Sequence, residues 1–286
     1  MSATMKSAEL KSIAVRGTPI AYRELGATHG VPLVLLHHIT AVIDDWDPDF
    51  VDALAKGRRV IAFDNAGVGA SDGVVPGSIE EMADTAVAFI DALGLTKVDL
   101  LGYSMGGFVA QVVTARRPDL VRKMILASTG AAGGPGIDRI WDVLQEAFAF
   151  AEREKKHPKQ RLFFKDSKAS QGAAALFLAR LQRPFTMPDR AIGDEAIQSQ
   201  VKAFITWGKS PDRYTSAITI PTFIAAGDSD EMIPLANAVD LATKVRGSRL
   251  AVYPDASHGA IFQHKETFVE HVNDFLNHRS LEERLP

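Results

Sequence analysis

The sequence predicts an α/β fold in which a mostly parallel, eight-stranded sheet is flanked by helices and carries an inserted helical lid. Three observations support this prediction. Short apolar stretches alternate with amphipathic helical patterns over residues 31–128, the alternation stops at Gly130, and it returns over residues 221–277. Strands that alternate with helices are typical of a parallel sheet, because each helix returns the chain to the edge where the next strand begins.

The expected elements follow one another in a simple order. Residues 12–16 and 20–24 flank Gly17, Thr18 and Pro19, which predicts an antiparallel hairpin at the sheet edge. The parallel part then alternates strand and helix, over residues 31–37, 48–56, 59–64, 78–93, 98–103, 107–117 and 121–128. After the interruption, strands at 221–226 and 249–253 alternate with helices at 235–245 and 265–277.

The interruption begins with a segment that cannot hold regular structure. Residues 130–136 read Gly-Ala-Ala-Gly-Gly-Pro-Gly, and from there to about Tyr214 the apolar spacing is helical, with no strand pattern. The sequence therefore predicts a core formed by residues 1–130 and 215–286, with a lid of residues 131–214 inserted into it.

Composition narrows the classes of function. With 46% hydrophobic residues, the 286-residue chain can bury a substantial core, and 32 basic against 35 acidic residues leave no basic stripe for nucleic acid. The absence of cysteine excludes disulfides, thiolate nucleophiles and cysteine-ligated metals. No signal peptide is expected in residues 1–11 and no stretch is long enough to span a membrane, so we expect a cytoplasmic protein without a membrane partner.

The motif Gly102-Tyr103-Ser104-Met105-Gly106 stands between an expected strand and an expected helix. A sharp strand-to-helix turn strains its apex residue and needs small neighbours, which Gly102 and Gly106 provide. Ser104 would then project above the sheet, and the first free helix amide, that of Met105, would point into the same space and stabilise an anion. This context predicts a nucleophilic serine.

A nucleophilic serine needs a base, and the base needs an acid to orient it. Of the eight histidines, His258 is best placed, because it follows the last expected strand in a loop at the carboxyl edge of the sheet. The loop after the strand at 221–226 offers three carboxylates near the same edge, Asp228, Asp230 and Glu231. Spacing alone does not choose among them.

The order serine, acid, histidine and the order of the core elements resemble the α/β-hydrolase superfamily, and the resemblance extends throughout the chain. The pattern Gly227-x-x-Asp230-x-x-Ile233-Pro234 resembles that family's acid loop. The resemblance implies that Asp230 is the acid, which leaves Asp228 to cap the loop.

The same resemblance implies a second oxyanion donor, the amide of Ile39, in the sequence His37-His38-Ile39-Thr40. Family members usually carry glycine where this chain has His38, which should narrow the pocket. Residues 64–71 resemble a family loop that we interpret as scaffold, because their glycines lack the spacing of a dinucleotide site.

These residues predict a serine hydrolase that cleaves a carboxylic ester, lactone or thioester through an acyl-enzyme intermediate, with Ser104, Asp230 and His258 as the triad. The expected partner is a small, largely apolar acyl substrate, and neither a metal nor an organic cofactor is required. His38 and Tyr103 are candidate substrate-lining residues, although His38 is expected more to fill space than to touch substrate. We expect most lid aromatics to form the lid's own core and a few to line an apolar pocket over Ser104, the set being Trp141, Phe148, Phe150, Phe163, Phe164, Phe177, Phe185, Phe204 and Trp207.

Three other functions fit the same fold. Family members include cofactor-independent perhydrolases or haloperoxidases with a similar triad. Carbon–carbon bond hydrolases are a further alternative, although the Gly-Pro-Gly that they often carry after His-Gly is absent here. The third is a ligand receptor that keeps the fold without turnover, against which the complete set of Ser104, Asp230 and His258 argues. The sequence does not predict the oligomeric state.

Overall fold

An eight-stranded sheet forms the centre of the computed structural model, which describes residues 3–278. Its strands lie in the order β1-β2-β4-β3-β5-β6-β7-β8. The bounds are Lys11–Val15 (β1), Thr18–Gly26 (β2), Leu33–Leu36 (β3), Arg59–Phe63 (β4), Val98–Tyr103 (β5), Val121–Ala127 (β6), Thr222–Gly227 (β7) and Arg249–Tyr253 (β8). β1 and β2 pair antiparallel, β2 pairs antiparallel with β4, and all other pairs are parallel. The predicted fold class and the edge hairpin are confirmed.

The hairpin turn is shorter than the sequence suggested. Thr18 and Pro19 belong to β2, where they pair with Val15 and Ala14. The turn consists of Arg16 and Gly17 alone, with φ values of 50° and 86°. Two residues at positive φ form the tight turn whose twist matches that of a hairpin, so the strands begin pairing sooner than a Gly-Thr-Pro loop allows.

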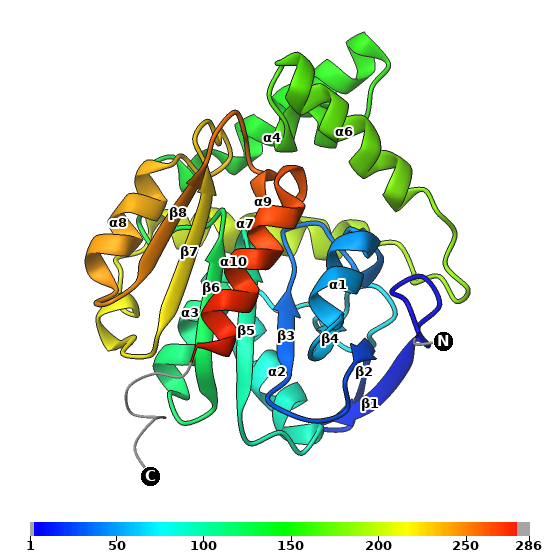
Figure 1. Cartoon of the computed structure of the whole chain (residues 1–286), viewed down its shortest axis with the longest axis vertical. Coiled ribbons are helices and arrows are strands. Elements are labelled where there is room, and N and C mark those ends of the chain that lie inside the picture. The colour runs from blue at the N-terminus through cyan, green and yellow to red at the C-terminus, as the bar shows by residue number, and fades with distance from the viewer. Residues whose placement is uncertain (1–2, 279–286) are drawn as a thin grey trace.

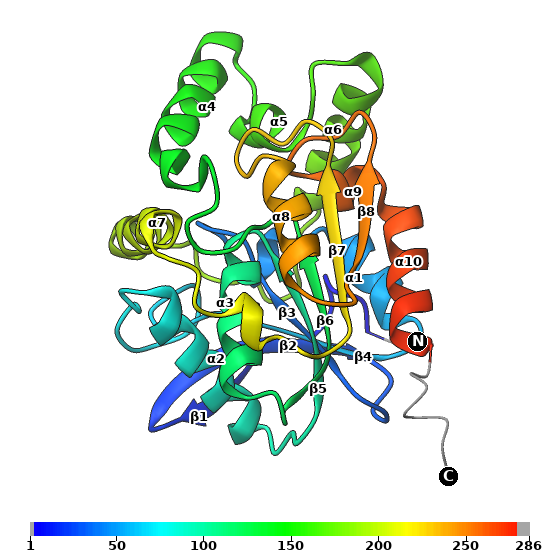
Figure 2. The same ribbon diagram turned by 90° about the vertical axis from the view of Figure 1, so that its left-hand side faces the viewer.

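Helices cover both faces of the sheet (Figures 1 and 2). α1 and α10 lie on one face, and α2, α3 and α8 lie on the other. Their bounds are Pro48–Ala55 (α1), Ile79–Ala92 (α2), Met105–Arg116 (α3), Ala236–Lys244 (α8) and Lys265–Asn277 (α10), and a short helix, α9 (Ala260–Gln263), precedes α10. The central strands β3 and β5 are buried along their whole length, as parallel strands covered on both faces must be.

Four α-helices lie between β6 and β7, and we call them the inserted helices. They are α4 (Ile140–Glu154), α5 (Pro158–Phe163), α6 (Lys168–Leu181) and α7 (Asp194–Lys209). Figures 1 and 2 show α4, α5 and α6 beyond the carboxyl ends of the parallel strands, with α7 closer to the sheet. No helix within residues 3–278 combines the length and the apolar character that crossing a bilayer requires.

Aspartates of the β3–α1 loop and of the first turn of α1 form ion pairs with the chain between β6 and β7, which we call the inserted segment. Asp45 in the loop pairs with Lys159 at 2.5 Å, Asp47, the N-cap of α1, pairs with Arg180 at 2.7 Å, and Asp49 in α1 pairs with Arg183. Asp44 accepts a hydrogen bond from the backbone amide of Asp189 at 2.8 Å. The inserted segment is therefore attached to the loop that leaves the carboxyl end of β3.

Candidate active site

Ser104 occupies the turn between β5 and α3 in a strained backbone conformation, with φ 56° and ψ −120°. Its neighbours hold it there. The Ser104 amide donates to the carbonyl of Ala127 at 2.9 Å, and the Thr129 hydroxyl donates to the carbonyl of Ser104 at 2.8 Å. The serine side chain is fully buried.

The flanking glycines allow the close approach that this turn needs. A Cβ on Gly102 would lie 2.4 Å from the carbonyl oxygen of Gly106, and a Cβ on Gly106 would lie 2.0 Å from that of Leu36. Both distances are far below van der Waals contact, so no other residue fits without moving the backbone. The start of α3 therefore lies directly against the end of β3.

His258 and Asp230 form a buried hydrogen-bonded pair. His258 Nδ1 lies 2.7 Å from Asp230 Oδ2. Asp230 Oδ1 also accepts from the amides of Met232 at 2.9 Å and Ile233 at 3.0 Å, which fixes the carboxylate. Because a carboxylate accepts, Nδ1 carries the proton, and Nε2 is the ring nitrogen that can act as a base.

Within the predicted triad, Ser104 Oγ and His258 Nε2 have no hydrogen-bond partner among the described residues, so they are not hydrogen-bonded to each other. Both residues have zero solvent exposure. Burial of a polar group without a partner costs free energy, so such groups are expected where a reaction needs them free. They are the groups that the sequence assigns to nucleophile and base.

The backbone of His258 is held by side chains from neighbouring strands. Its carbonyl accepts from the Tyr103 hydroxyl at 3.1 Å and from the Ser128 hydroxyl at 2.9 Å. Tyr103 is fully buried, and its ring packs on that of His258 with a 5.3 Å centroid separation. The Tyr103 hydroxyl therefore positions the His258 backbone, and its expected substrate-lining role stays a prediction.

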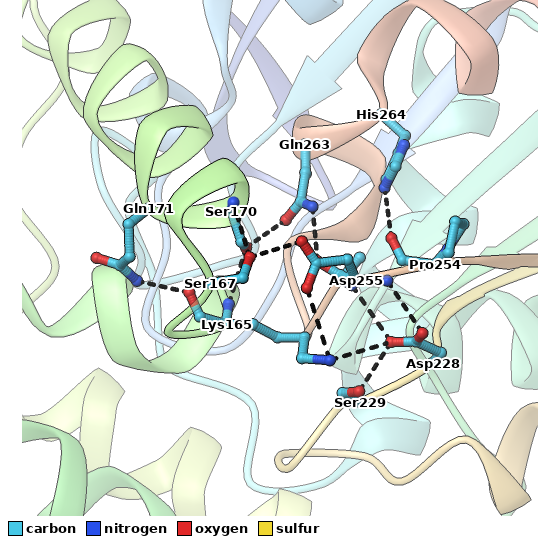
Figure 3. A network of polar contacts seen from close by, with 11 residues as sticks. Lys165, Ser167, Ser170, Gln171, Asp228, Ser229, Pro254, Asp255, Gln263 and His264 are labelled. Carbon is cyan, nitrogen blue, oxygen red and sulfur yellow. Dashed lines mark hydrogen bonds and ion pairs between the residues drawn. The ribbon is translucent and has the colours of Figure 1, made fainter.

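Asp228, the other aspartate of the acid loop, belongs to a separate polar network (Figure 3). Its carboxylate accepts from the amides of Asp255 at 3.0 Å and Ala256 at 3.3 Å, just before His258. Lys165 and Ser167, ahead of and at the start of α6, contact Asp255 at 3.7 Å and 2.6 Å. Asp228 thus lies where the loop-capping interpretation expects it.

The two predicted oxyanion donors, the amides of Ile39 and Met105, make no hydrogen bond with any group of residues 3–278. The next amide along the loop, that of Thr40, donates instead to Gln200 Oε1 of α7 at 2.7 Å. Free amides on two adjoining segments fit an anion-binding site.

His38 is buried and packs edge-on against Tyr103 and Phe163, at centroid separations of 5.4 Å and 5.3 Å. Its Nδ1 donates to the Ile39 carbonyl at 2.7 Å. Burial, helped by the positive charge of Lys159, lowers the pKa of His38 to about 3, so the ring is neutral at pH 7. These contacts suit a space-filling residue better than a substrate-lining one.

Several supporting residues escaped the sequence analysis. Gln200 and Ser128 bind backbone groups that are remote in sequence, and no local motif announces such contacts. Phe163 was expected only as one lid aromatic, yet its carbonyl accepts from the Gly259 amide at 2.9 Å, beside His258. Among residues 3–278, no group of three or more His, Asp or Glu side chains is arranged to hold a metal.

Comparisons with known proteins show the family and the fold of this chain. A family model described as the alpha/beta hydrolase fold matches residues 31–265. A 2-hydroxymuconate semialdehyde hydrolase from Pseudomonas sp. (strain CF600) is 27% identical over 96% of this chain and 97% of its own.

Two solved structures add to this picture. An alpha/beta hydrolase fold protein from Chitinophaga pinensis has a TM-score of 0.91 and 34% identity, covering 97% of this chain and 100% of its own. Est816, described as an N-acyl homoserine lactone degrading enzyme, has a TM-score of 0.72 and 25% identity, and the match covers 93% of this chain and 100% of the Est816 chain.

Proposed function

The chain belongs to the alpha/beta hydrolase fold family, and from this membership and the geometry around Ser104 we propose that it cleaves carboxylic esters, lactones or thioesters of small, largely apolar substrates. The proposed reaction passes through an acyl-enzyme intermediate on Ser104. The observation that carries the proposal is that the two buried groups without a hydrogen-bond partner, Ser104 Oγ and His258 Nε2, belong to the predicted nucleophile and to the histidine that Asp230 holds by a hydrogen bond.

In the first step, Ser104 Oγ attacks the substrate carbonyl while His258 Nε2 accepts its proton. Asp230 stabilises the resulting imidazolium through Nδ1–H. The amides of Met105 and Ile39 donate to the oxyanion of the tetrahedral intermediate, and collapse of that intermediate expels the alcohol or thiol, which takes the proton from His258.

In the second step, His258 removes a proton from water, whose oxygen attacks the acyl carbon. The same two amides stabilise the second oxyanion. Collapse releases the carboxylic acid, and the proton returns from His258 to Ser104 Oγ. Atoms balance with water as the one co-substrate.

We assign the inserted helices, within residues 131–214, to a lid over the site. Ser104 and His258 are fully buried, so a substrate reaches them only when covering residues move. α5 is part of this cover, because the Phe163 ring lies 5.7 Å from that of His258. Aromatic cover of this kind favours an apolar acyl or alcohol portion.

A serine-directed label and one variant test the proposal. Wild-type protein should react with a fluorophosphonate probe and hydrolyse members of a panel of acyl esters, thioesters and lactones. Ser104→Ala should abolish labelling and lower kcat/KM by at least about 10³-fold with its fold retained. Ser216→Ala, at an exposed position, is the control. Full turnover by Ser104→Ala would refute the proposal.

A second candidate is the carbon–carbon bond hydrolysis that the family resemblance implies, and a 2-hydroxymuconate semialdehyde hydrolase is among the relatives of this chain. The same serine and histidine would serve that reaction. Assays with a vinylogous 1,5-diketone, run beside the ester panel, separate the two activities. A peroxide-dependent bromination assay on the same preparation tests the perhydrolase alternative.

A further inference from the structure

Gln200 lies where the inserted helices meet the loop that carries Ile39. We propose that Gln200 is a positioning residue for the oxyanion hole: by binding the Thr40 amide, it fixes the adjacent Ile39 amide whenever α7 is docked. The inference rests on the proposed hydrolase function, because it concerns the donors that would stabilise its intermediates. In this proposal, the oxyanion hole is complete only when the inserted helices are docked on the core.

The first evidence is the contact itself. Gln200 Oε1 accepts from the Thr40 amide at 2.7 Å, and Gln200 is 1% exposed. Thr40 has a φ of 61°, which a β-branched residue rarely adopts. Such strain persists only where surrounding contacts hold it, and this hydrogen bond is one of them. Without the acceptor, the backbone of residues 39 and 40 is free to relax.

α7 also contacts the segments that carry both oxyanion donors, the loop of Ile39 and the helix of Met105. Phe204 and Trp207, one and two turns beyond Gln200, pack on Phe108 at centroid separations of 4.8 Å and 5.1 Å. Phe108 belongs to α3, whose first residue is Met105. One helix therefore holds the loop of the Ile39 amide and packs against the helix that begins with the Met105 amide.

The third evidence is that other parts of the inserted segment hold the same loop. Lys159 pairs with Asp45 at 2.5 Å, and the Asp189 amide donates to Asp44 at 2.8 Å. Movement of the inserted segment would release these contacts together with the Gln200 contact. An open protein would then have a loosely placed Ile39 amide, and only the closed protein would stabilise an oxyanion fully.

The test replaces Gln200 with methionine, which has a similar volume but no strong acceptor. We expect Gln200→Met to lower kcat about tenfold with KM changed less than about twofold, because the contact acts on the transition state. Complete loss of one oxyanion donor would lower kcat by about 10²- to 10³-fold, and this sets an upper limit for the effect of Gln200→Met. Gln198→Met, exposed on the same helix, should behave as wild type.

Two further measurements separate positioning from a merely structural role. Thr40→Gly relieves the positive φ, so the Thr40→Gly, Gln200→Met double variant should recover part of the lost kcat. In hydrogen–deuterium exchange, peptides spanning residues 37–42 should exchange faster in Gln200→Met than in wild type or Gln198→Met.

If Gln200→Met leaves kcat unchanged, or if a rise in KM accounts for the whole loss of kcat/KM, the proposal for Gln200 is overturned. Hydrolysis by the wild type would still support the proposed function. Unchanged exchange of residues 37–42 would overturn it whatever the activity. The proposed function itself is tested separately, by the activity of Ser104→Ala and by labelling with the fluorophosphonate probe.

Discussion

Two carboxylates of one loop, Asp228 and Asp230, differ in what they hold. Asp230 accepts from the His258 ring and from two amides of its own loop, and it is 5% exposed. Asp228 accepts from the amides of residues 255 and 256 and from Ser229. One orients a ring, and the other shapes the loop that carries this ring.

Replacing each carboxylate with its amide should separate these roles. Asp230→Asn should lower kcat by roughly 10⁴-fold, because the Asn side-chain amide can favour the wrong histidine tautomer and cannot stabilise an imidazolium. Asp228→Asn should leave kcat within about threefold and lower the free energy of unfolding by about 1 kcal/mol. Ester hydrolysis and urea unfolding measure both effects. Equal losses of activity would contradict the assignment of Asp230.

The sequence predicts some site residues and misses others for a physical reason. Ser104 can be predicted because a strained turn needs glycines around it. His258 can be predicted because it lies in the loop after the last expected strand, at the carboxyl edge of the sheet. Asp230 could be selected only by resemblance, since Asp228 lies on the same loop. Gln200 and Tyr103 act through backbone groups far away in the chain, and these contacts exist only once the elements have packed.

At the scale of elements, the central strand, turn and helix around Ser104 leave no space for added atoms. Gly107, the third glycine here, packs on Thr129, where a Cβ would lie 2.5 Å from both Cγ2 and Oγ1. Gly172 in α6 is exposed and has nothing within 4 Å of a Cβ. The same substitution therefore has opposite effects in these two helices.

Alanine at the two glycines tests this contrast. Gly172→Ala should raise the free energy of unfolding by about 0.5–1 kcal/mol, because alanine loses less backbone entropy in a helix. Gly107→Ala should lower it by about 1–3 kcal/mol through overpacking and should displace the Thr129 hydroxyl from the Ser104 carbonyl. Chemical denaturation of both variants measures the effects. A change of the same sign in both would contradict the packing argument.

Element types could be predicted where one periodicity dominates. The six later strands, the hairpin and the core helices appear near their expected ranges, because apolar alternation and caps such as Ser78 before α2 are local signals. The two-residue turn at Arg16 and Gly17 could not be predicted, since Thr18 and Pro19 also favour turns. Helical spacing after Gly130 predicts helices there, but not the contacts through which α5 and α7 reach the site.

At the scale of the whole molecule, aspartates after β3 connect the inserted helices to the core with ion pairs of unequal burial. Asp47 is fully buried, begins α1 as its cap, and pairs with Arg180 at 2.7 Å. Asp49 pairs with Arg183 where both side chains are at least one-third exposed. We expect removal of the arginine from the buried pair to lower the free energy of unfolding more than removal from the exposed pair, because solvent screens exposed charges.

Arginine-to-methionine variants should show this difference. Arg180→Met leaves Asp47 buried without its cation and should lower the free energy of unfolding by about 3 kcal/mol. Arg183→Met should lower it by less than about 1 kcal/mol, and the loss should shrink further at high salt. Urea unfolding at low and high ionic strength compares them. A larger loss for Arg183→Met would mean that burial does not rank these contacts.

Buried titratable groups give the whole protein opposing pH dependences. Burial lowers the pKa of His37 to about 4 and, with Lys159, that of His38 to about 3. The unfolded chain therefore binds more protons below pH 6.5, so acid destabilises the fold. Burial and the neighbouring Asp189 raise the pKa of Asp64 well above 3.8. The folded protein keeps that proton longer, so stability declines as pH rises above 3.8 until Asp64 ionises in the fold.

The two histidines predict a loss of stability as pH falls below 6.5. Each histidine costs up to about 1.4 kcal/mol per pH unit there, and the two together exceed the opposite effect of one aspartate. Urea unfolding from pH 5 to 6.5 should show this loss. His38→Phe should weaken the acid decline, whereas Asp64→Asn, which removes the opposing contribution, should not weaken it. Equal stability at pH 5 and 6.5 would show that the histidines are not held neutral by burial.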